Sequence, residues 1–189
     1  MELAVEESYL SVRDYLEGEE VSKIKCEFIA GRVYAMSGGT VNHHTVAMNF
    51  ARHAGNQLFG KSCRTFNSDL KIRIDLGNEQ AFYYPDASIV RSPLGGNDHF
   101  TDSPAVILEV LSPSTRRIDE VQKFRDYLTI PSLQVYLLAE ADFQKVTIYR
   151  RRGEIFHRET IAGPYGVLDL PEVEVSILLG DLYAEVQLP

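Results

Sequence analysis

Two carboxylates stand out because each interrupts an apolar segment. Glu109 lies in the run AVILEVL, residues 105–111, and Asp86 lies in YYPDASIV, residues 83–90. A charged carboxylate in a buried strand is costly to desolvate unless it has a partner. Either a basic side chain or a metal ion would serve. The run itself therefore does not distinguish a structural ion pair from a functional carboxylate.

Asp86 follows Pro85, which lacks a backbone N–H, so a strand edge or bulge is expected there. Taken alone, Asp86 is typical of a turn or capping residue. Two carboxylates on adjacent strands, however, can share one hard cation. Mg²⁺ binds through few carboxylates and keeps several waters. Together with Glu109, Asp86 therefore predicts a Mg²⁺ site, with Mn²⁺ as the alternative ion.

The motifs around these residues resemble those of the Uma2 family of restriction-endonuclease-like proteins. YYPDASIV and then VILEVLSPSTRRIDEVQKFRDYL are similar to its PD on one strand, EVLSPST at the end of the next, and D-x-x-x-K-x-x-x-Y on a helix. Asp119, Lys123 and Tyr127 occupy those helical positions. The resemblance covers nearly the whole chain. It departs from the general PD-(D/E)xK nuclease signature at Leu111, where that signature has lysine.

The resemblance implies a role for each matching residue. Asp86 and Glu109 would bind the metal together with the backbone carbonyl of Val110. Lys123 would replace the lysine missing from the strand. The implied reaction is hydrolysis of DNA phosphodiester bonds, in which the metal activates a water and Lys123 stabilises negative charge. Spacing alone also allows Lys123 to form an ordinary i,i+4 surface pair with Asp119.

Two residues nearer the N-terminus also match the family. Glu27 resembles its N-terminal glutamate, which would orient the metal site or hold a water; otherwise it is a surface charge at a strand end. His44 resembles the helical histidine; otherwise it is a helix-face histidine bonded to the backbone. A zinc pair of His43 and His44 is not expected, because neighbouring helical side chains point about 100° apart.

Hydrophobic periodicity predicts the helices that position these residues. We expect a short helix after Ser11 that ends at Gly18, a second over 41–59, and a third from about 116 to 129 that is capped within 112–115. Their predicted inner faces are Val12, Tyr15 and Leu16; Val41, Thr45, Met48, Ala51, Gly55 and Leu58; and Ile118, Val121, Phe124 and Leu128.

Strands are expected between these helices and after the last of them. The predicted ranges are 26–30 and 32–36 around a turn at Gly31, then 70–75, 82–90, 105–111, 134–139, 145–150 and 154–161, with a strand and short helix in 173–183. This order predicts an α/β or α+β fold: a restriction-endonuclease-like core with a mixed central sheet flanked by helices, preceded by a helix and hairpin. We expect one domain over 1–189.

The composition excludes some classes of protein. With 189 residues, 44% of them hydrophobic, the chain can bury a substantial core. No apolar run reaches the ~20 residues that span a bilayer, and the acidic start lacks the basic residues of a signal peptide. We expect a soluble, cytoplasmic protein without a membrane partner, in which Cys26 and Cys63 are reduced.

The formal net charge of −8 counts against strong non-specific binding to nucleic acid. It leaves a nuclease possible, because a bound cation offsets carboxylate charge and basic residues cluster at 116–117 and 150–152. Both clusters are otherwise solvated surface. The first choice is a Mg²⁺-dependent DNA endonuclease, as a homodimer suited to two dyad-related strands. The alternatives are a non-catalytic domain that binds a protein and a metal-dependent hydrolase of another phosphoester.

Overall fold

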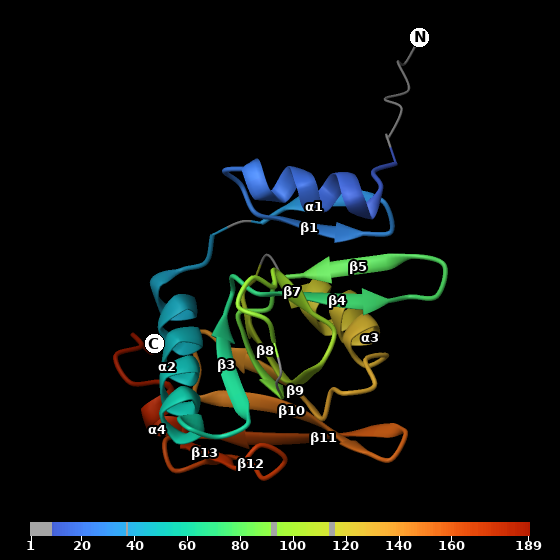
Figure 1. Cartoon of the computed structure of the whole chain (residues 1–189). Helices are drawn as coiled ribbons and strands as arrows, with labels where there is room; N and C mark the ends of the chain where they lie inside the picture. Colours follow the sequence, from blue (N-terminus) through green and yellow to red (C-terminus); the bar gives the residue numbers. More distant parts are fainter. Residues whose placement is uncertain (1–8, 37, 92–93, 114–115) are drawn as a thin grey trace.

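A computed structural model describes residues 9–36, 38–91, 94–113 and 116–189. One sheet has five strands, in the order β2 (Arg32–Ala35), β1 (Cys26–Ile29), β5 (Gln80–Tyr83), β4 (Lys71–Asp75) and β7 (Phe100–Thr101) (Figure 1). A larger sheet has six, in the order β11 (Ile155–Ala162), β10 (Lys145–Arg152), β9 (Val135–Glu140), β8 (Pro104–Leu111), β6 (Ala87–Arg91) and β3 (Cys63–Asn67). β12 (Val167–Leu170) and β13 (Val175–Leu178) form a separate hairpin.

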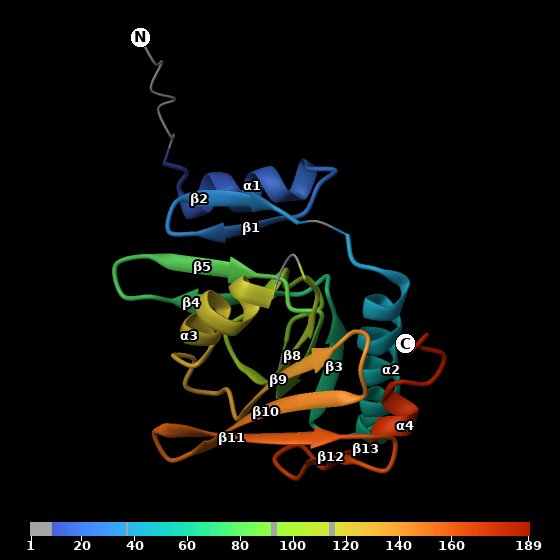
Figure 2. The ribbon, with the colours of Figure 1, turned by 180° about the vertical axis from the view of Figure 1, so that it is seen from behind.

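Helices flank these sheets. α1 (Val12–Val21) covers the β1–β2 hairpin, and α2 (Val41–Leu58) runs along one side of the molecule. On the opposite side, a π-helical segment, η1 (Ile118–Lys123), continues into α3 (Phe124–Tyr127), seen beside β4 in Figure 2. α4 (Leu179–Leu182) lies near the C-terminus. Because β8 and β9 are parallel while β6 and β8 are antiparallel, the predicted mixed sheet flanked by helices is confirmed.

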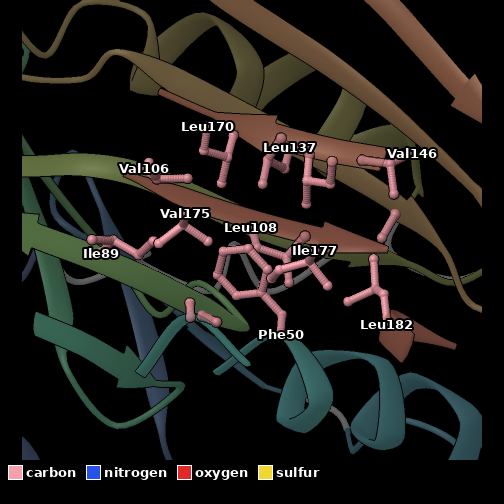
Figure 3. Packing of buried hydrophobic residues seen from close by; sticks show 14 of the residues in the cluster. Phe50, Ile89, Val106, Leu108, Leu137, Val146, Leu170, Val175, Ile177 and Leu182 are labelled. Atoms are coloured by element: carbon pink, nitrogen blue, oxygen red, sulfur yellow. The ribbon is translucent and has the colours of Figure 1, made fainter. Parts of the chain in front are cut away.

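β8 is the central strand that its apolar sequence predicted, and all eight of its residues are buried. Successive side chains of a strand point to opposite faces. Val106, Leu108 and Val110 therefore join the core beneath α2, whereas Ile107 and Leu111 join a second core beside α3. Figure 3 shows side chains of the first core, among them Phe50 of α2, converging on the sheet.

The N-terminal helix begins as predicted but ends later. The Ser11 side chain caps it by accepting the Asp14 N–H at 3.1 Å, and Tyr15 is buried against Phe28 with 5.0 Å between ring centroids. The predicted end at Gly18 is wrong, because the helix continues to Val21. A single glycine costs a helix only about 1 kcal/mol. After it, Glu19 accepts hydrogen bonds from the backbone N–H of Cys26 and from Tyr84, which favours continuation of the helix.

The predicted strand over 82–90 is in fact two strands in two different sheets. β5 ends at Tyr83 and β6 begins at Ala87, so the chain crosses from one sheet to the other through 84–86. Pro85 cannot donate a ladder hydrogen bond, which favours a break at this point. The break leaves Asp86 between the sheets.

The predicted inner stripe of α2 is wrong except for Leu58. Val41 is 81% exposed and Met48 is 60% exposed. The buried positions are His43, Val46, Asn49, Phe50, Ala54 and Leu58. The buried face differs from the predicted one because it includes two polar residues that have partners. His43 bonds Asp86, and the Asn49 side chain donates to two backbone carbonyls near the C-terminus. A stripe chosen by hydrophobicity alone does not include such residues.

Half of the predicted inner face of the third helix is confirmed, because Phe124 and Leu128 are partly buried against the second core, and the other half is wrong. Ile118 is 44% exposed and Val121 is 63% exposed. The buried side chains are instead Asp119, Lys123, Asp126 and Tyr127. Their partners lie inside the molecule, so ion pairing and hydrogen bonding outweigh the burial of two aliphatic side chains. Of the segment 112–115 that was predicted to cap this helix, residues 114 and 115 lie outside the described residues.

Three short strands, β3, β7 and β12, were not predicted. The exposure pattern of β3 is irregular, β7 has only two residues, and β12 alternates but has only four. The hairpins around Gly31 and Gly153 form as expected, and both glycines have positive φ. A Cβ at Gly31 would lie 2.2 Å from the Tyr9 ring. No helix among the described residues is long and apolar enough to cross a membrane.

Candidate active site

We call α1 and the β1–β2 hairpin the N-terminal layer. A cleft of about 400 Å³ opens where this layer, the start of α2 and the η1 segment meet. The acids Asp86, Glu109 and Asp119 line it together with Lys123, His43 and His44. Its other wall contains Lys23, Lys25 and Tyr84. The structure thus brings together most of the residues that the sequence singled out, although they come from widely separated parts of the chain.

Strand geometry sets Glu109 against Asp86. Ala87 pairs with Leu108 across β6 and β8, so Asp86 and Glu109 lie one step further along the same two strands. Glu109 shares its face of β8 with Ile107 and Leu111, which is the face that packs beside α3. The Glu109 side chain accordingly meets donors from that helix.

Glu109 is only 2% exposed and accepts two hydrogen bonds at the same oxygen. Lys123 Nζ donates to Glu109 Oε1 at 3.1 Å, and Tyr127 Oη donates to it at 3.0 Å. The buried charge is therefore compensated, as the cost of desolvation demands. Both bonds use Oε1, so Oε2 stays outside them.

Lys123 is buried, which rules out the exposed i,i+4 pair that spacing alone allowed. Its amine lies 2.9 Å from Glu27 Oε1, 3.1 Å from Glu109 Oε1 and 3.6 Å from Asp119 Oδ1. The i,i+4 pair with Asp119 exists, but it is the longest of the three contacts and faces inward. Lys123 is thus the shared cation of three carboxylates from β1, β8 and η1.

Asp86 is held by two donors. The backbone N–H of Val110 donates to Asp86 Oδ2 at 2.7 Å, and His43 Nε2 donates to Asp86 Oδ1 at 2.9 Å. The contact from Val110 is thus made by its N–H; the predicted role of its carbonyl as a metal ligand stays a prediction. The two bonds fix the orientation of the carboxylate at the break between the sheets.

His43 bonds Asp86, whereas the sequence had singled out its neighbour. His44 is exposed and lines the cleft, and its described contact with the site is an edge-to-face packing against the His43 ring at 5.3 Å. His43 is 8% exposed, and a Cβ on Gly39 would lie 2.7 Å from its ring. His43 could have been identified from the sequence by its helical spacing, because it lies on the same face of α2 as the buried residues Val46, Phe50 and Ala54.

Glu27 is 9% exposed rather than a surface charge at a strand end. Its Oε1 accepts the backbone N–H of Tyr84 at 3.2 Å and contacts Lys123 at 2.9 Å. Tyr84 Oη in turn donates to Glu19 of α1 at 2.5 Å. The N-terminal helix and hairpin are therefore connected to Lys123 through Glu27 and Tyr84.

The electrostatics follow from crowding four carboxylates around few cations. Burial raises the pKa of Glu109 well above its ordinary value; Lys123 opposes this rise, while Asp119, Asp86 and Glu27 add to it. Burial lowers the pKa of Lys123, but the surrounding carboxylates outweigh burial, and the net pKa is well above the usual value. Lys123 therefore stays charged, and the site has an excess of negative charge.

The pKa values of His43 and Tyr127 are raised in part by the carboxylates that they contact. Burial lowers the pKa of His43, but the hydrogen bond to Asp86 and the charge of Asp86 outweigh it and raise the net pKa. Burial raises the pKa of Tyr127 well above its usual value, and the Glu109 charge adds to the rise. Tyr127 therefore remains a neutral donor to Glu109.

The donor set suits a hard cation. Among the described residues, no three His, Cys, Asp or Glu side chains form a ready-made metal cage. Mg²⁺ does not require one, because it is typically held by one or two carboxylates and several waters. Asp86 and Glu109 supply two carboxylates in one cleft, so the residues present fit such an ion.

The arginine clusters have structural contacts. Arg150 binds Glu159 and Glu172, and Arg151 donates to backbone carbonyls after α3, including that of Ile130 at 2.8 Å. Arg116 pairs with Glu120 and Glu140. Arg117 is exposed. Neither cluster lines the cleft, so the hypothesis that they supply its positive charge is not supported.

Comparison with known proteins agrees with this architecture. A crystal structure described as a "putative nuclease belonging to DUF820" from Anabaena variabilis superposes with a TM-score of 0.73, at 18% identity, over 94% of this chain and 99% of that one. The shared fold is the restriction-endonuclease-like one that the motifs predicted.

Sequence relatives include two proteins of Synechocystis sp. "Uncharacterized protein slr1290" is 37% identical over 146 residues, covering 77% of this chain and 76% of the relative. "Uncharacterized protein sll1609" is 32% identical over 152 residues, covering 77% and 82%. The family model described as "Uma2: Putative restriction endonuclease" matches residues 12–178. Because that match extends from the start of α1 to the end of β13, the chain belongs to the Uma2 family.

Proposed function

We propose that this protein is a Mg²⁺-dependent endonuclease that hydrolyses phosphodiester bonds of DNA. The observation that carries the proposal is the position of Lys123, a buried amine 3.1 Å from Glu109 in the same cleft as Asp86. Two acids and a lysine around one cleft are the elements that metal-assisted phosphodiester hydrolysis requires. Membership of a family whose model is described as "Putative restriction endonuclease" supports the same reaction.

Each residue has a role in this proposal. Asp86 and Glu109 hold the ion, together with the carbonyl of Val110. A bound Mg²⁺ would polarise a phosphoryl oxygen and lower the pKa of a coordinated water. Lys123 orients the attacking water or stabilises the negative charge that develops on the phosphate, and Glu27 fixes the position of the Lys123 amine.

The setting of the reaction is also part of the proposal. We place the protein in the cytoplasm as a homodimer. Cys26 and Cys63 are both free, which suits a reducing compartment. A twofold assembly would present two clefts to the two strands of a duplex.

A cleavage assay tests the reaction. Labelled single-stranded DNA, duplex DNA and RNA are incubated with the full chain in Mg²⁺, in Mn²⁺ and in chelator. We expect cleavage of DNA that requires metal and disappears in Asp86→Asn and Glu109→Gln. A small phosphodiester, bis(p-nitrophenyl) phosphate, is included to detect a hydrolase of other phosphoesters.

The outcome also separates the alternatives. Hydrolysis of the small diester without cleavage of any nucleic acid would identify a phosphoesterase of another kind. No hydrolysis of any substrate by a folded protein would leave the non-catalytic, protein-binding domain as the better description. In either case the endonuclease proposal would be abandoned.

A further inference from the structure

The cleft has two ends of opposite charge. Its inner end contains Asp86, Glu109 and Asp119 around Lys123. Its outer wall is formed by the loop between α1 and β1, where Lys23, Ile24 and Lys25 line it. Positive charge at this wall contrasts with the net charge of −8 for the whole chain. With a cation held by the acids of the inner end, a ligand that contacts both ends would be an anion longer than one phosphate.

The outer lysines differ in how they are held. Lys25 Nζ bonds the Asp69 carboxylate and the Ser68 carbonyl, and it lies 5.5 Å from the centre of the Tyr84 ring. Lys23 is exposed, and within the part of the chain that the structure describes no ion pair or hydrogen bond of its side chain is found. Lys25 therefore anchors the loop, while the Lys23 amine remains available to a ligand.

The loop that carries Lys23 is ordered by its own hydrogen bonds. Ser22 Oγ donates to the Ile24 carbonyl at 2.7 Å and accepts the Ile24 N–H at 3.1 Å. Ile24 is 60% exposed beside the cleft, which Met36 also lines. The wall thus offers a cation and apolar side chains next to each other, which suits the alternating phosphate and sugar of a nucleic-acid strand.

The size of the cleft restricts the form of that strand. Glu109 and Asp119 are each only 2% exposed, so a reacting phosphate must enter the cleft to reach them. A volume of about 400 Å³ is that of a site for one small ligand. The phosphates of a duplex face outward, but a duplex is stiff, with a persistence length of about 50 nm, and carries a second strand alongside. A flexible single strand can bend into a cleft of this size, whereas a duplex has to be locally unpaired to do so.

We infer that the cleft takes single-stranded or locally unpaired nucleic acid, with Lys23 binding the phosphate next to the one at the inner end. This inference rests on the proposed function, since it names the form of substrate for the same site. It adds a binding residue, Lys23, that lies outside the acid and lysine motifs of the sequence. Each lysine–phosphate contact releases condensed counterions, so the contact has a measurable salt dependence.

Fluorescence anisotropy of the full chain in Ca²⁺ tests this inference, because Ca²⁺ is a hard cation that binds carboxylates and offsets their charge. Gels of the same samples check that the probes stay intact. The probes are a fluorescein-labelled 12-nucleotide deoxythymidine strand and the same strand annealed to its complement, each titrated at several salt concentrations. Lys23→Ala is compared with Lys61→Ala, which removes the same charge from an exposed lysine paired with Glu174 outside the cleft.

We expect the wild type to bind the single strand more tightly than the duplex. Lys23→Ala should weaken single-strand binding several-fold and reduce the slope of log Kd against log salt by about 0.7, the value for one phosphate contact on a single strand. Lys61→Ala should match the wild type. Equal behaviour of the two variants, or duplex binding as tight as single-strand binding, would overturn the inference.

The two proposals fail in different ways. Metal-dependent cleavage that is unaffected by Lys23→Ala, together with unchanged binding, would leave the endonuclease intact and remove the Lys23 subsite. Lys23-dependent binding of single strands without cleavage in any metal would retain the subsite and remove the nuclease.

Discussion

At the scale of single residues, the site is a problem of charge balance. Lys123 contacts three carboxylates, and Asp86 pairs with His43. The sequence left open whether Glu109 belongs to a structural ion pair or to a functional site. In the structure Glu109 forms an ion pair with Lys123, which is the lysine that we expect to be catalytic. A structural ion pair and a functional carboxylate are therefore not exclusive for Glu109.

The substitution Glu109→Gln removes one negative charge from this group. Lys123 keeps Glu27 and Asp119 as partners, so the variant should be as stable as the wild type in chelator, or more stable. Mg²⁺ at 100 times its Kd should stabilise the wild type by about 2.7 kcal/mol and leave the variant unchanged. Thermal melts of both proteins, with Mg²⁺ and with chelator, measure this.

The pH dependence of the same comparison has a definite sign. Because the folded pKa of Glu109 is raised, the stability that its carboxyl contributes is fully present below its unfolded pKa of about 4.3 and is lost as the pH rises through the folded value. The Tm of Glu109→Gln relative to wild type should therefore increase from pH 4 to pH 7.

Asp126→Asn is the matched control for both measurements. Asp126 is also a 2% exposed carboxylate, but it accepts from Tyr83 and does not line the cleft. Its replacement should leave the effect of Mg²⁺ intact. A large loss of stability in Glu109→Gln that is the same with and without metal would contradict the assignment of Glu109 as a metal ligand.

Lys123→Met tests the shared cation. It strands Glu27, Glu109 and Asp119 without their lysine, which should cost about 3–5 kcal/mol, whereas an exposed helical pair would cost a few tenths. Urea denaturation in chelator measures the loss. Mg²⁺ should restore part of the stability, because it supplies positive charge to the same acids, while cleavage should stay at least about 10²-fold below wild type. A loss under 1 kcal/mol would refute this account of Lys123.

The adjacent histidines provide a matched pair of variants. His43→Ala removes a donor to Asp86 and should weaken Mg²⁺ binding and cleavage about 10–100-fold, as expected for a residue that orients a metal ligand. His44→Ala removes an exposed side chain without that bond and should change either quantity less than 3-fold by the same reasoning. Calorimetry of Mg²⁺ binding and cleavage rates compare them. Equal effects of the two variants would assign no special role to His43.

The candidate site was largely predictable because its signals are local. The acids at 86 and 109 break apolar segments, and Lys123 occupies a motif position; all three line the cleft. The choice between His43 and His44 was not predictable in the same way. It depends on the rotation of α2 about its axis, and that rotation is set by tertiary hydrogen bonds rather than by hydrophobicity.

At the scale of elements, strands followed from the sequence more reliably than helix faces. The apolar run of β8 and the alternation of Ile72 and Ile74 in β4 predict which apolar residues are buried, because a strand has only two faces. Lys71 is the exception in β4, since it is buried as well. A helix can rotate by a fraction of a turn, and both α2 and η1 bury polar residues that have partners. Amphipathicity read from hydrophobic residues alone therefore fails at helices that line a site.

The N-terminal layer is the element whose removal should affect the site from a distance. Phe28 packs on Tyr15 and Phe82, and Glu27 beside it reaches Lys123. Phe28→Ala should cost about 3–5 kcal/mol by leaving a cavity and should lower cleavage because the hairpin no longer fixes Glu27. Val33→Ala, on the exposed strand of the same hairpin, should change little.

Hydrogen exchange locates this effect. In Phe28→Ala, amides of α1, β1 and β2 should exchange faster while β8 stays protected, since layers with few buried contacts open first. Uniformly faster exchange over the whole chain would show that the layer does not open as a separate unit. Unchanged exchange and unchanged cleavage would show that the aromatic contacts do not position Glu27.

Across the whole molecule, the net charge opposes binding of nucleic acid, whereas the lysines that line the cleft favour it. The chain has a net charge of −8, which repels a polyanion. Among the described residues, the cleft nevertheless brings Lys23, Lys25 and Lys123 together on its walls. A molecule of this kind should bind nucleic acid weakly except at the cleft.

The oligomeric state should determine how many strands of a duplex are cut. One cleft can cut one strand at a time, so a monomer should nick duplex DNA, while a dimer with twofold symmetry can cut two dyad-related strands. We expect sedimentation at micromolar concentration to show a dimer of the 189-residue chain, formed through a sheet edge or helix face away from the buried strand β8. Supercoiled plasmid in Mg²⁺ gives an independent measurement. Negative supercoiling favours local unpairing, and a dimer should cut both strands of an unpaired segment and linearise the plasmid without accumulating the nicked form. Sedimentation as a monomer alone, together with accumulation of nicked circles, would contradict the dimer while leaving the chemistry of the single site intact.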